Sequence, residues 1–353
     1  MDPFTHALSG ALAGRALSPS GAKRRVARAA TWTGVAAVLA PDLDYLLRLL
    51  ADPLTYLNWH RTFTHSLPLL PLWAGLLAWL LRPARRLLGA RRVWALCVAG
   101  MALHVAGDLI TPFGTAILWP LSGRRFSLES TFVVDPLVTA PLAAGLLAGV
   151  RWGRRRTALA ALAVAAAVVA LEWGLRQRAL GIARAHAAAL GLPPERARAL
   201  PQPLSPLRWK LVVETPTGYE VAHVRLGAGG LAQAAAGDGW LGRFSSAYRP
   251  PGMLRWEPAE HPARGRRHPL AAAAWARPEL EGFRRFAGLP FVLGTGADAA
   301  GRACVWLSDL RFVVPGLPPP FRFEVCRAGG GKGWSLRPLP RRPRGTQAPF
   351  MAD

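Results

Sequence analysis

The chain has 353 residues and carries 44 Lys and Arg against 20 Asp and Glu, a formal net charge of +24. It is nevertheless apolar, with 51% hydrophobic and 18% charged residues, which excludes a disordered basic tail because such segments have low hydrophobicity. The same composition argues against a purely nucleic-acid-binding module, which concentrates positive charge without so much apolar sequence. Three cysteines are too few for a disulfide framework or a thiolate zinc site.

The positive charges of the first half form three clusters that contain no acidic residue. Residues 1–175 hold 18 Lys and Arg, of which 14 lie in these clusters. The clusters are Arg15, Lys23, Arg24, Arg25 and Arg28; Arg82, Arg85, Arg86, Arg91 and Arg92; and Arg151, Arg154, Arg155 and Arg156. Between and beyond them lie five apolar segments: 29–50, 67–81, 93–119, 132–150 and 157–175. Segments near the roughly 20 residues that cross a bilayer predict four to five membrane helices.

The charge clusters also predict a topology. The positive-inside rule places all three on the cytoplasmic side, so that residues 41–65 and 104–136 fall at the opposite ends of the helices. If 157–175 runs outward from the third cluster, residues 176–353 lie outside the cytoplasm. The adjacent pair Arg124 and Arg125 is the weak point of this topology, which leaves both on the outer side.

The second half has a different pattern. Residues 207–226 contain two β-branched runs separated by Thr-Pro-Thr-Gly, which predicts a hairpin, and residues 303–314 and 321–326 predict further strands. Residues 278–286 favour a short helix. The predicted fold is therefore mainly α, a polytopic membrane helix bundle with a small β-rich C-terminal domain. The expected parts are the bundle (1–176), a helical linker with a Pro-rich hinge (177–206), the β-rich or α+β domain (207–338) and a disordered tail (339–353).

Histidine and aspartate residues gather in the first half, on the predicted outer side. Ionisable residues at membrane-helix ends are costly, so a functional role is the default interpretation. Mixed His and Asp ligation suits Zn²⁺, with Mn²⁺ or Fe²⁺ as alternatives, and such an ion supports hydrolysis. The candidate ligands are His6, Asp42, Asp44, His60, His65, His104 and Asp108.

The spacing of these residues only partly separates metal ligands from residues with a structural role. His104 and Asp108 lie four residues apart, which places both on one helix face as two ligands or as a hydrogen-bonded pair. Asp44 is either a ligand or the N-cap of a following helix. His60 and His65 are five apart, which favours one of them as a ligand, and His6 is equally compatible with a structural role.

Three further roles are open in the same region. Asp44 or Asp108 is the candidate general base. Arg61 is either a clamp for a phosphate or carboxylate oxygen or a surface anchor. We expect His186, His223, His261 and His268, all in the second half, to be surface residues.

Several linked motifs resemble one family. MDPFTHALSGALAG, APDLDY, HRTFTHS and HVAGDLITPFGT are similar, in order and spacing, to the YdjM-like family of membrane-bound proteins with an ascribed metal-dependent hydrolase activity. The resemblance covers about residues 1–150 and implies a bacterial inner-membrane protein whose His and Asp motifs bind metal. It adds Asp135 as an eighth candidate ligand. Thr62 departs from the pattern, where glycine is expected.

The leading hypothesis is an integral membrane metal-dependent hydrolase acting on an ester or phosphoester, with a lipid-borne or amphipathic molecule as the expected substrate. The alternative is a non-catalytic membrane protein with a structural metal site and a partner-binding C-terminal domain. Nucleic-acid binding through the +24 charge is a third reading. It is disfavoured because the basic clusters separate apolar segments instead of lining a soluble face.

Overall fold

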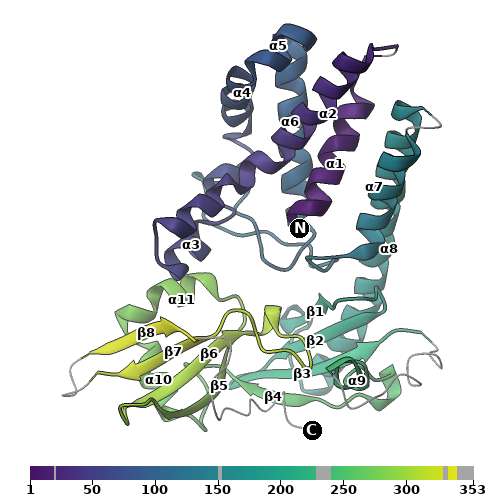
Figure 1. Ribbon diagram of the computed structural model, residues 1–353. Coiled ribbons are helices and arrows are strands. Elements are labelled where there is room, and N and C mark those ends of the chain that lie inside the picture. Colours follow the sequence, from purple (N-terminus) through teal and green to yellow (C-terminus); the bar gives the residue numbers. More distant parts are fainter. Residues whose placement is uncertain (20, 150–152, 228–239, 329–332, 340–353) are drawn as a thin grey trace. The chain divides into compact units, whose positions relative to one another are not determined.

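A computed structural model describes residues 1–19, 21–149, 153–227, 240–328 and 333–339 (Figure 1). The chain divides into two compact units. The helical unit comprises residues 1–52 and 59–174, and the β unit comprises residues 53–58 and 175–353. The expected tail, 339–353, lies outside the described residues except for Leu339.

The helical unit is built around α6, which contacts α1, α2 and α4 (Figure 1). Helix α1 also packs against α2 and α7. The elements of this unit are α1 (Pro3–Ala16), α2 (Arg24–Leu39), the 3-10 helices η1 (Ala40–Leu49) and η2 (Phe63–His65), α4 (Leu70–Leu80), α5 (Arg82–Leu88), α6 (Ala90–Leu109), α7 (Pro136–Ala148) and the larger part of α8 (Arg154–Ala189). Helix α3 (Pro53–Trp59) lies almost entirely in the β unit.

Small residues allow α1 and α2 to approach closely. A Cβ atom added to Gly34 would lie 2.1 Å from the carbonyl oxygen of Gly10, and one added to Gly14 would lie 2.3 Å from the carbonyl oxygen of Ala30. The spacing of Gly10 and Gly14 is the small-xxx-small pattern that brings membrane helices into backbone contact. This contact fixes α1, and with it His6, against the rest of the unit.

Two of the described helices, α6 and α8, are long and apolar enough to cross a membrane. A third candidate is the pair Pro53–His65 and Leu70–Leu80, which is bent by 83°. Helix α7 is apolar but has only 13 residues. The membrane character expected from the sequence therefore rests on two helices, or three if the bent pair is one span.

The expected apolar segments are longer than the helices that form. Helix α6 ends at Leu109 and not near residue 119, because Thr111 precedes a proline and Gly114 has a φ of 87°. Helix α2 ends at Leu39, and Pro41 lies in the 3-10 helix that follows. The segment 132–150 becomes helical only at Pro136, where α7 begins.

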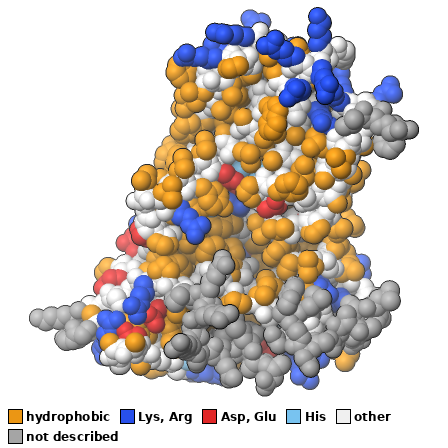
Figure 2. Space-filling view, viewed as in Figure 1, with side chains coloured by type: hydrophobic (Ala, Val, Ile, Leu, Met, Phe, Trp, Pro, Cys, Tyr) orange, Lys and Arg blue, Asp and Glu red, His pale blue; other side chains and the backbone are white. Residues whose placement is uncertain are grey.

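The basic clusters gather at one end of the helical unit. Figure 2 shows Lys and Arg side chains at that end and apolar side chains along the flanks of the helices. Arg15 and Arg154 line the same pocket, which joins the first and third clusters, and α2 contacts α5, which carries part of the second. Arg151 lies outside the described residues.

The β unit contains two four-stranded antiparallel sheets with the strand orders β1-β2-β3-β4 and β5-β6-β7-β8. The expected hairpin is confirmed as β2 and β3, and the helix expected at 278–286 is confirmed as η5 and α11. The elements are η3 (Pro194–Arg196), β1 (Ala197–Pro201), β2 (Arg208–Glu214), β3 (Gly218–Arg225), α9 (Trp240–Ser246), η4 (Pro251–Met253), β4 (Glu257–Glu260), α10 (Pro269–Trp275), η5 (Pro278–Leu280), α11 (Glu281–Phe286), β5 (Pro290–Ala297), β6 (Ala303–Asp309), η6 (Leu310–Phe312), β7 (Phe323–Arg327) and β8 (Trp334–Pro338).

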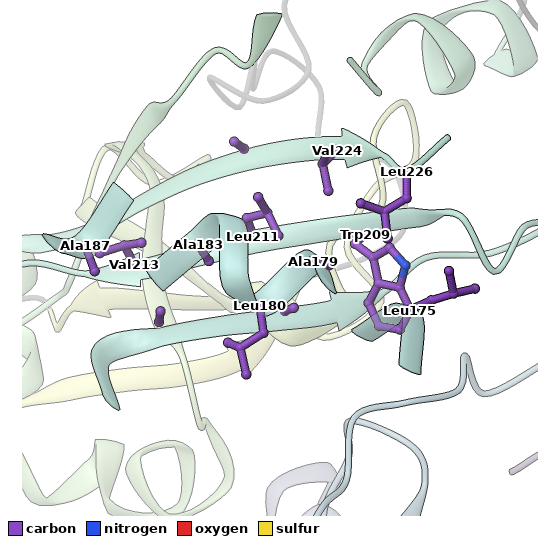
Figure 3. Close-up of a cluster of buried hydrophobic side chains, with 13 residues drawn as sticks. Leu175, Ala179, Leu180, Ala183, Ala187, Trp209, Leu211, Val213, Val224 and Leu226 are labelled. Carbon is purple, nitrogen blue, oxygen red and sulfur yellow. The ribbon is translucent and has the colours of Figure 1, made fainter. Parts of the chain in front are cut away.

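The end of α8 covers one face of the first sheet. Ala183 of α8 belongs to the same buried cluster as Trp209 and Leu211 of β2 (Figure 3). Because side chains alternate along a strand, Val212 points to the other face, where it packs with Phe291 of β5. Residues 177–206, expected as a linker, thus supply the last turns of α8 and strand β1 to the core of the β unit.

A disulfide joins neighbouring strands of the second sheet. Cys304 of β6 is paired in register with Cys326 of β7, and the two form a disulfide. Cys97 is free and buried. The cysteine count correctly predicts that there is no framework of several disulfides. It did not predict the single disulfide between Cys304 and Cys326. Asp298 lies close to it, yet the bridged sulfurs are not thiolates and this grouping is not a thiolate metal site.

Candidate metal centre

Four elements bring the predicted ligands together at the end of the helical unit away from the basic clusters. His6 lies in the first turn of α1, whereas Arg15 lies in its last turn. His104 and Asp108 lie at the end of α6, about 20 Å and about 25 Å along the helix from Arg91, given a rise of roughly 1.5 Å per residue. The 3-10 helix η1 contributes Asp42 and Asp44, and the segment around η2 contributes His60 and His65.

Four side chains form a compact group that is able to hold a metal ion. One ligand atom from each lies within 4.8 Å of the others. The Nε2 atoms of His65 and His104 are 3.0 Å apart, and Oδ2 of Asp108 lies 3.2 Å and 3.4 Å from them. Oδ1 of Asp42 lies 3.8 Å and 3.5 Å from the same two nitrogens. Asp42 has a side-chain exposure of 14%, and the other three are at most 1% exposed.

The chemistry of this group fits a divalent ion. Within the described part of the chain, Oδ2 of Asp108 is buried and accepts no hydrogen bond, although it faces two imidazole nitrogens. Nε of Arg61 lies 2.9 Å from it but makes no hydrogen bond among these residues either, so this is a contact between charges. Two imidazole nitrogens and two carboxylate oxygens form a ligand set suited to zinc, manganese or iron.

Thr64 determines which nitrogen of His65 faces the group. Oγ1 of Thr64 donates its proton to Oδ2 of Asp44 at 3.1 Å and lies 2.9 Å from Nδ1 of His65. Because a hydroxyl has one proton, Thr64 must accept from His65, which assigns the imidazole proton to Nδ1. The lone pair on Nε2 then points into the group. Such outer partners orient metal-binding histidines.

Asp44 and His60 form a second pair beside the group. Nδ1 of His60 donates to Oδ1 of Asp44 at 2.9 Å, and Oδ2 of Asp44 accepts from the backbone N–H of Arg61 at 3.0 Å. Asp44 is therefore not a helix cap; it holds the segment that carries His60 and His65. Asp42, Asp44 and His60 also lie close enough together to form a second grouping that shares Asp42 with the first.

Arg61 is buried, which excludes one of the two roles expected for it, that of a surface anchor. Its Nη1 donates to Oγ1 of Thr111 at 2.9 Å, and its guanidinium carbon lies 4.9 Å from the ring centroid of Phe113. Its φ of 60° is unusual for a residue other than glycine. Its guanidinium lies against the carboxylate of Asp108 at the candidate centre, and its role as a clamp for a substrate oxygen stays a prediction.

His6 and Asp135 lie outside the group of four. His6 stacks on His104 with the ring centroids 3.9 Å apart, and its Nε2 is 3.2 Å from Oδ1 of Asp108. Gly107 makes room for this ring, since a Cβ there would lie 3.0 Å from it. Asp135 instead caps α7 by accepting from the N–H of Leu137 at 2.8 Å. His6 thus supports the group, and Asp135 has a structural role.

Arg125 lies on the side of the helical unit where the positive-inside rule expects no positive charge, and its contacts give it a structural role there. Its guanidinium donates to the carbonyl oxygens of His60 and Gly114, at 3.0–3.1 Å. It also lies 5.7 Å from the ring of Phe113, the residue that Arg61 contacts. Arg125 therefore ties the loop after α6 to the histidine segment. Sequence reasoning treated it only as a charge and missed this role.

The four histidines of the second half are not all surface residues. His223 is partly buried on β3, and this burial lowers its pKa to about 3. His186 stacks on Trp256 and pairs with Glu220 at 2.7 Å. No described His, Cys, Asp or Glu joins His223 or His186 in a grouping of three or more that is able to hold a metal.

The sequence comparisons agree with the membrane character of the helical unit. The model of a family described as "YdjM inner membrane protein" matches residues 1–179. The chain is also 30% identical over 141 residues to a Bacillus subtilis (strain 168) protein named "Uncharacterized protein YfhP". That alignment covers 39% of this chain and 43% of the relative, so the chain spans less than half of the relative's length. No solved structure gives a significant match.

Proposed function

Because the chain belongs to the YdjM inner membrane protein family, we propose that it is an integral membrane hydrolase that depends on a divalent metal ion. The observation that carries the proposal is the buried group of four ligand atoms at the end of α6. The ligands would be Asp42, His65, His104 and Asp108. Zinc is the ion we expect, with manganese or iron as alternatives.

The proposed arrangement in the membrane has four to five spans, with the basic end in the cytoplasm of a bacterial cell. Helix α6 has 20 residues, about 30 Å, which matches the thickness of the hydrocarbon core. Arg91 at its start and Asp108 near its end then lie at opposite interfaces, so the centre faces the non-cytoplasmic side. The disulfide between Cys304 and Cys326 supports a non-cytoplasmic β unit, because disulfides persist in oxidising compartments.

When bound, the ion supplies Lewis-acid chemistry that activates water and polarises an ester or phosphoryl oxygen. The residues around it supply position and charge. Thr64 orients His65, and Arg61 offsets the negative charge that Asp42 and Asp108 bring together. Asp44 lies beside the group and is the candidate proton acceptor, held in place by its hydrogen bonds to His60 and Arg61.

The proposal is tested first by metal content. In the full chain purified in detergent, we expect about one ion per chain by mass spectrometry, since one group of four ligands makes one site. His104→Ala combined with Asp108→Ala should reduce this to a background level. The matched control is His268→Ala. This histidine is half-buried in the β unit, and its side chain makes no capping hydrogen bond at the start of α10. Unchanged metal in the double variant would refute the site.

The second test concerns chemistry. Asp44→Asn should retain the ion. Its rate of hydrolysis of a chromogenic phosphodiester should fall roughly 10²–10⁴-fold, the range for loss of a general base. A chain that binds the ion but hydrolyses no ester or phosphoester, and that unfolds more easily when the ion is removed, would instead carry a structural site. The deep burial of three of the four ligands is the observation that favours this second function.

A further inference from the structure

An apolar cavity of about 280 Å³ lies in the helical unit beside the candidate metal centre. It is open on one side and is lined by residues of η1, η2 and α4 and by Met101 of α6. Among its described lining residues only Asp44 and Thr64 carry hydrogen-bonding oxygen atoms in their side chains, and both belong to the network that orients His65. The apolar lining includes Leu43, Leu47, Trp73, Leu77, Leu80 and Met101.

The cavity extends from the centre toward the basic end of the unit. Met101 precedes His104 by three residues on α6, about 4.5 Å nearer to the basic end. On α4, the lining runs from Trp73 to Leu80, about 10 Å along the helix axis. A molecule that fills the cavity therefore has one end at Asp44 and the other in the apolar body of the unit.

Exposed leucines surround the cavity. Leu46, Leu50 and Leu80 line it and are 58%, 85% and 58% exposed. Apolar side chains this exposed, on a unit with membrane-spanning helices, face lipid and not water. A molecule that enters between them comes from the bilayer.

We propose that the cavity binds one acyl chain of a membrane lipid and holds the lipid's phosphoester headgroup against the metal centre. This inference rests on the proposed function and gives its substrate class, a lipid-borne phosphoester. A helix of another chain is too wide: a cylinder 10 Å across fills 280 Å³ with about 3.5 Å of its length, or roughly two residues. A single hydrocarbon chain is narrow enough to follow the lining along α4. The lack of any Lys or Arg among the described lining residues is consistent with a hydrocarbon occupant.

The orientation agrees with that of a bilayer lipid. A lipid in the outer leaflet has its headgroup at the interface and its chains directed toward the membrane centre. In the arrangement proposed above, the metal centre lies at that interface, and the cavity runs inward from it past Met101. The headgroup and the chain thus reach their sites together without leaving the leaflet.

Photolabelling tests the inference. The full chain, reconstituted in phosphatidylcholine nanodiscs, is irradiated with a dodecyl phosphate that carries a diazirine near the chain end, and labelled peptides are mapped by mass spectrometry. We expect labels in η1 and α4 and at least tenfold less labelling by the butyl analogue, because each methylene buried adds binding energy. The labelling should persist after treatment with a chelator, since the chain and not the ion provides that energy.

Two variants on α4 make the test specific. Leu76→Trp fills the cavity and should reduce labelling at least fivefold, whereas Leu72→Trp, on a residue 64% exposed that does not line it, should leave labelling unchanged. Leu76→Phe is a milder filling variant, and an unchanged metal content in each variant confirms that the chain is folded. Equal labelling by both probes, or no difference between Leu76→Trp and Leu72→Trp, would overturn the cavity assignment. Chain-dependent labelling without phosphoester hydrolysis would leave the acyl site standing and refute the hydrolase.

Discussion

The hydroxyl of Thr64 lies between the carboxylate of Asp44 and Nδ1 of His65, and it transmits the orientation of the first to the second. Asp44 is itself fixed by the backbone N–H of Arg61, a residue in a left-handed conformation. The local backbone around Arg61 is thereby coupled to the direction of the Nε2 lone pair of His65. His65, which the sequence presents as one histidine among several, is thus held in place by Thr64, Asp44 and Arg61.

The first prediction concerns this relay. Thr64→Val keeps the side-chain volume but removes the hydroxyl, so that neither nitrogen of His65 is fixed as the proton carrier. We expect metal affinity to fall roughly 10–100-fold, the usual cost of losing an outer partner of a metal-binding histidine. Competition with a chromophoric chelator measures it. Thr64→Ser, which retains the hydroxyl, should restore most of the affinity; equal affinity in Thr64→Val would show that the relay has no role.

The second prediction concerns the contact between α1 and α2. Gly34→Ala places a methyl group 2.1 Å from the carbonyl oxygen of Gly10, which forces the helices apart and should cost about 1–3 kcal/mol of unfolding free energy. Gly75→Ala, on α4 with no atom near its added Cβ, is the control and should be neutral or slightly stabilising. Thermal unfolding in detergent compares them. A Gly34→Ala chain as stable as Gly75→Ala would contradict the close packing.

The third prediction is a pH dependence of the β unit. Lys210 is fully buried on β2 and donates to the carbonyl oxygens of Leu310 and Val313, and burial lowers its pKa to about 7. Between pH 7 and the ordinary lysine value the unfolded chain binds more protons than the folded one. The unfolding free energy should therefore rise with pH in this window, by on the order of 1.4 kcal/mol per pH unit at most.

Denaturant unfolding of the full chain at pH 7.5 and 9.5, followed by a probe on the β unit, measures this rise. Lys210→Met should abolish it, while Lys23→Met, at an exposed lysine of the helical unit, should not. A rise that survives in Lys210→Met would assign the effect to other groups.

The fourth prediction concerns the cysteines. If the β unit matures in an oxidising compartment, the denatured but unreduced chain should react with one maleimide-polyethylene glycol, at Cys97, and the reduced chain with three. Gel mobility counts the additions. Three additions before reduction would place Cys304 and Cys326 in a reducing compartment and contradict the proposed topology.

The four residues that the structure groups together are all among the candidates taken from the sequence, because costly polar side chains in apolar segments are conspicuous. The positive-inside rule placed them together on one predicted side of the membrane. The sequence did not separate the four grouped residues from their neighbours: His60 and His65 look alike in it, and only the hydrogen bonds of Asp44 and Thr64 distinguish them. A threonine between two histidine positions gives no signal of its own.

The ends of the helices were less predictable for a physical reason. Apolar composition continues past residue 109, but the backbone leaves the helix where Thr111 precedes proline and Gly114 turns. The loop that results depends on Arg125, whose contacts with His60 and Gly114 join segments distant in sequence. The pairing of Cys304 with Cys326 likewise follows from strand register, which cysteine counting does not reveal.

The four candidate ligands are unequally buried, and this would set the route by which an ion reaches them. His65, His104 and Asp108 are closed to solvent, and only Asp42 has an exposed edge. An ion bound by this group would enter and leave past Asp42 and the 3-10 helix that carries it. We therefore expect a chelator in solution to remove such an ion slowly, at a rate set by the opening of this short backbone segment.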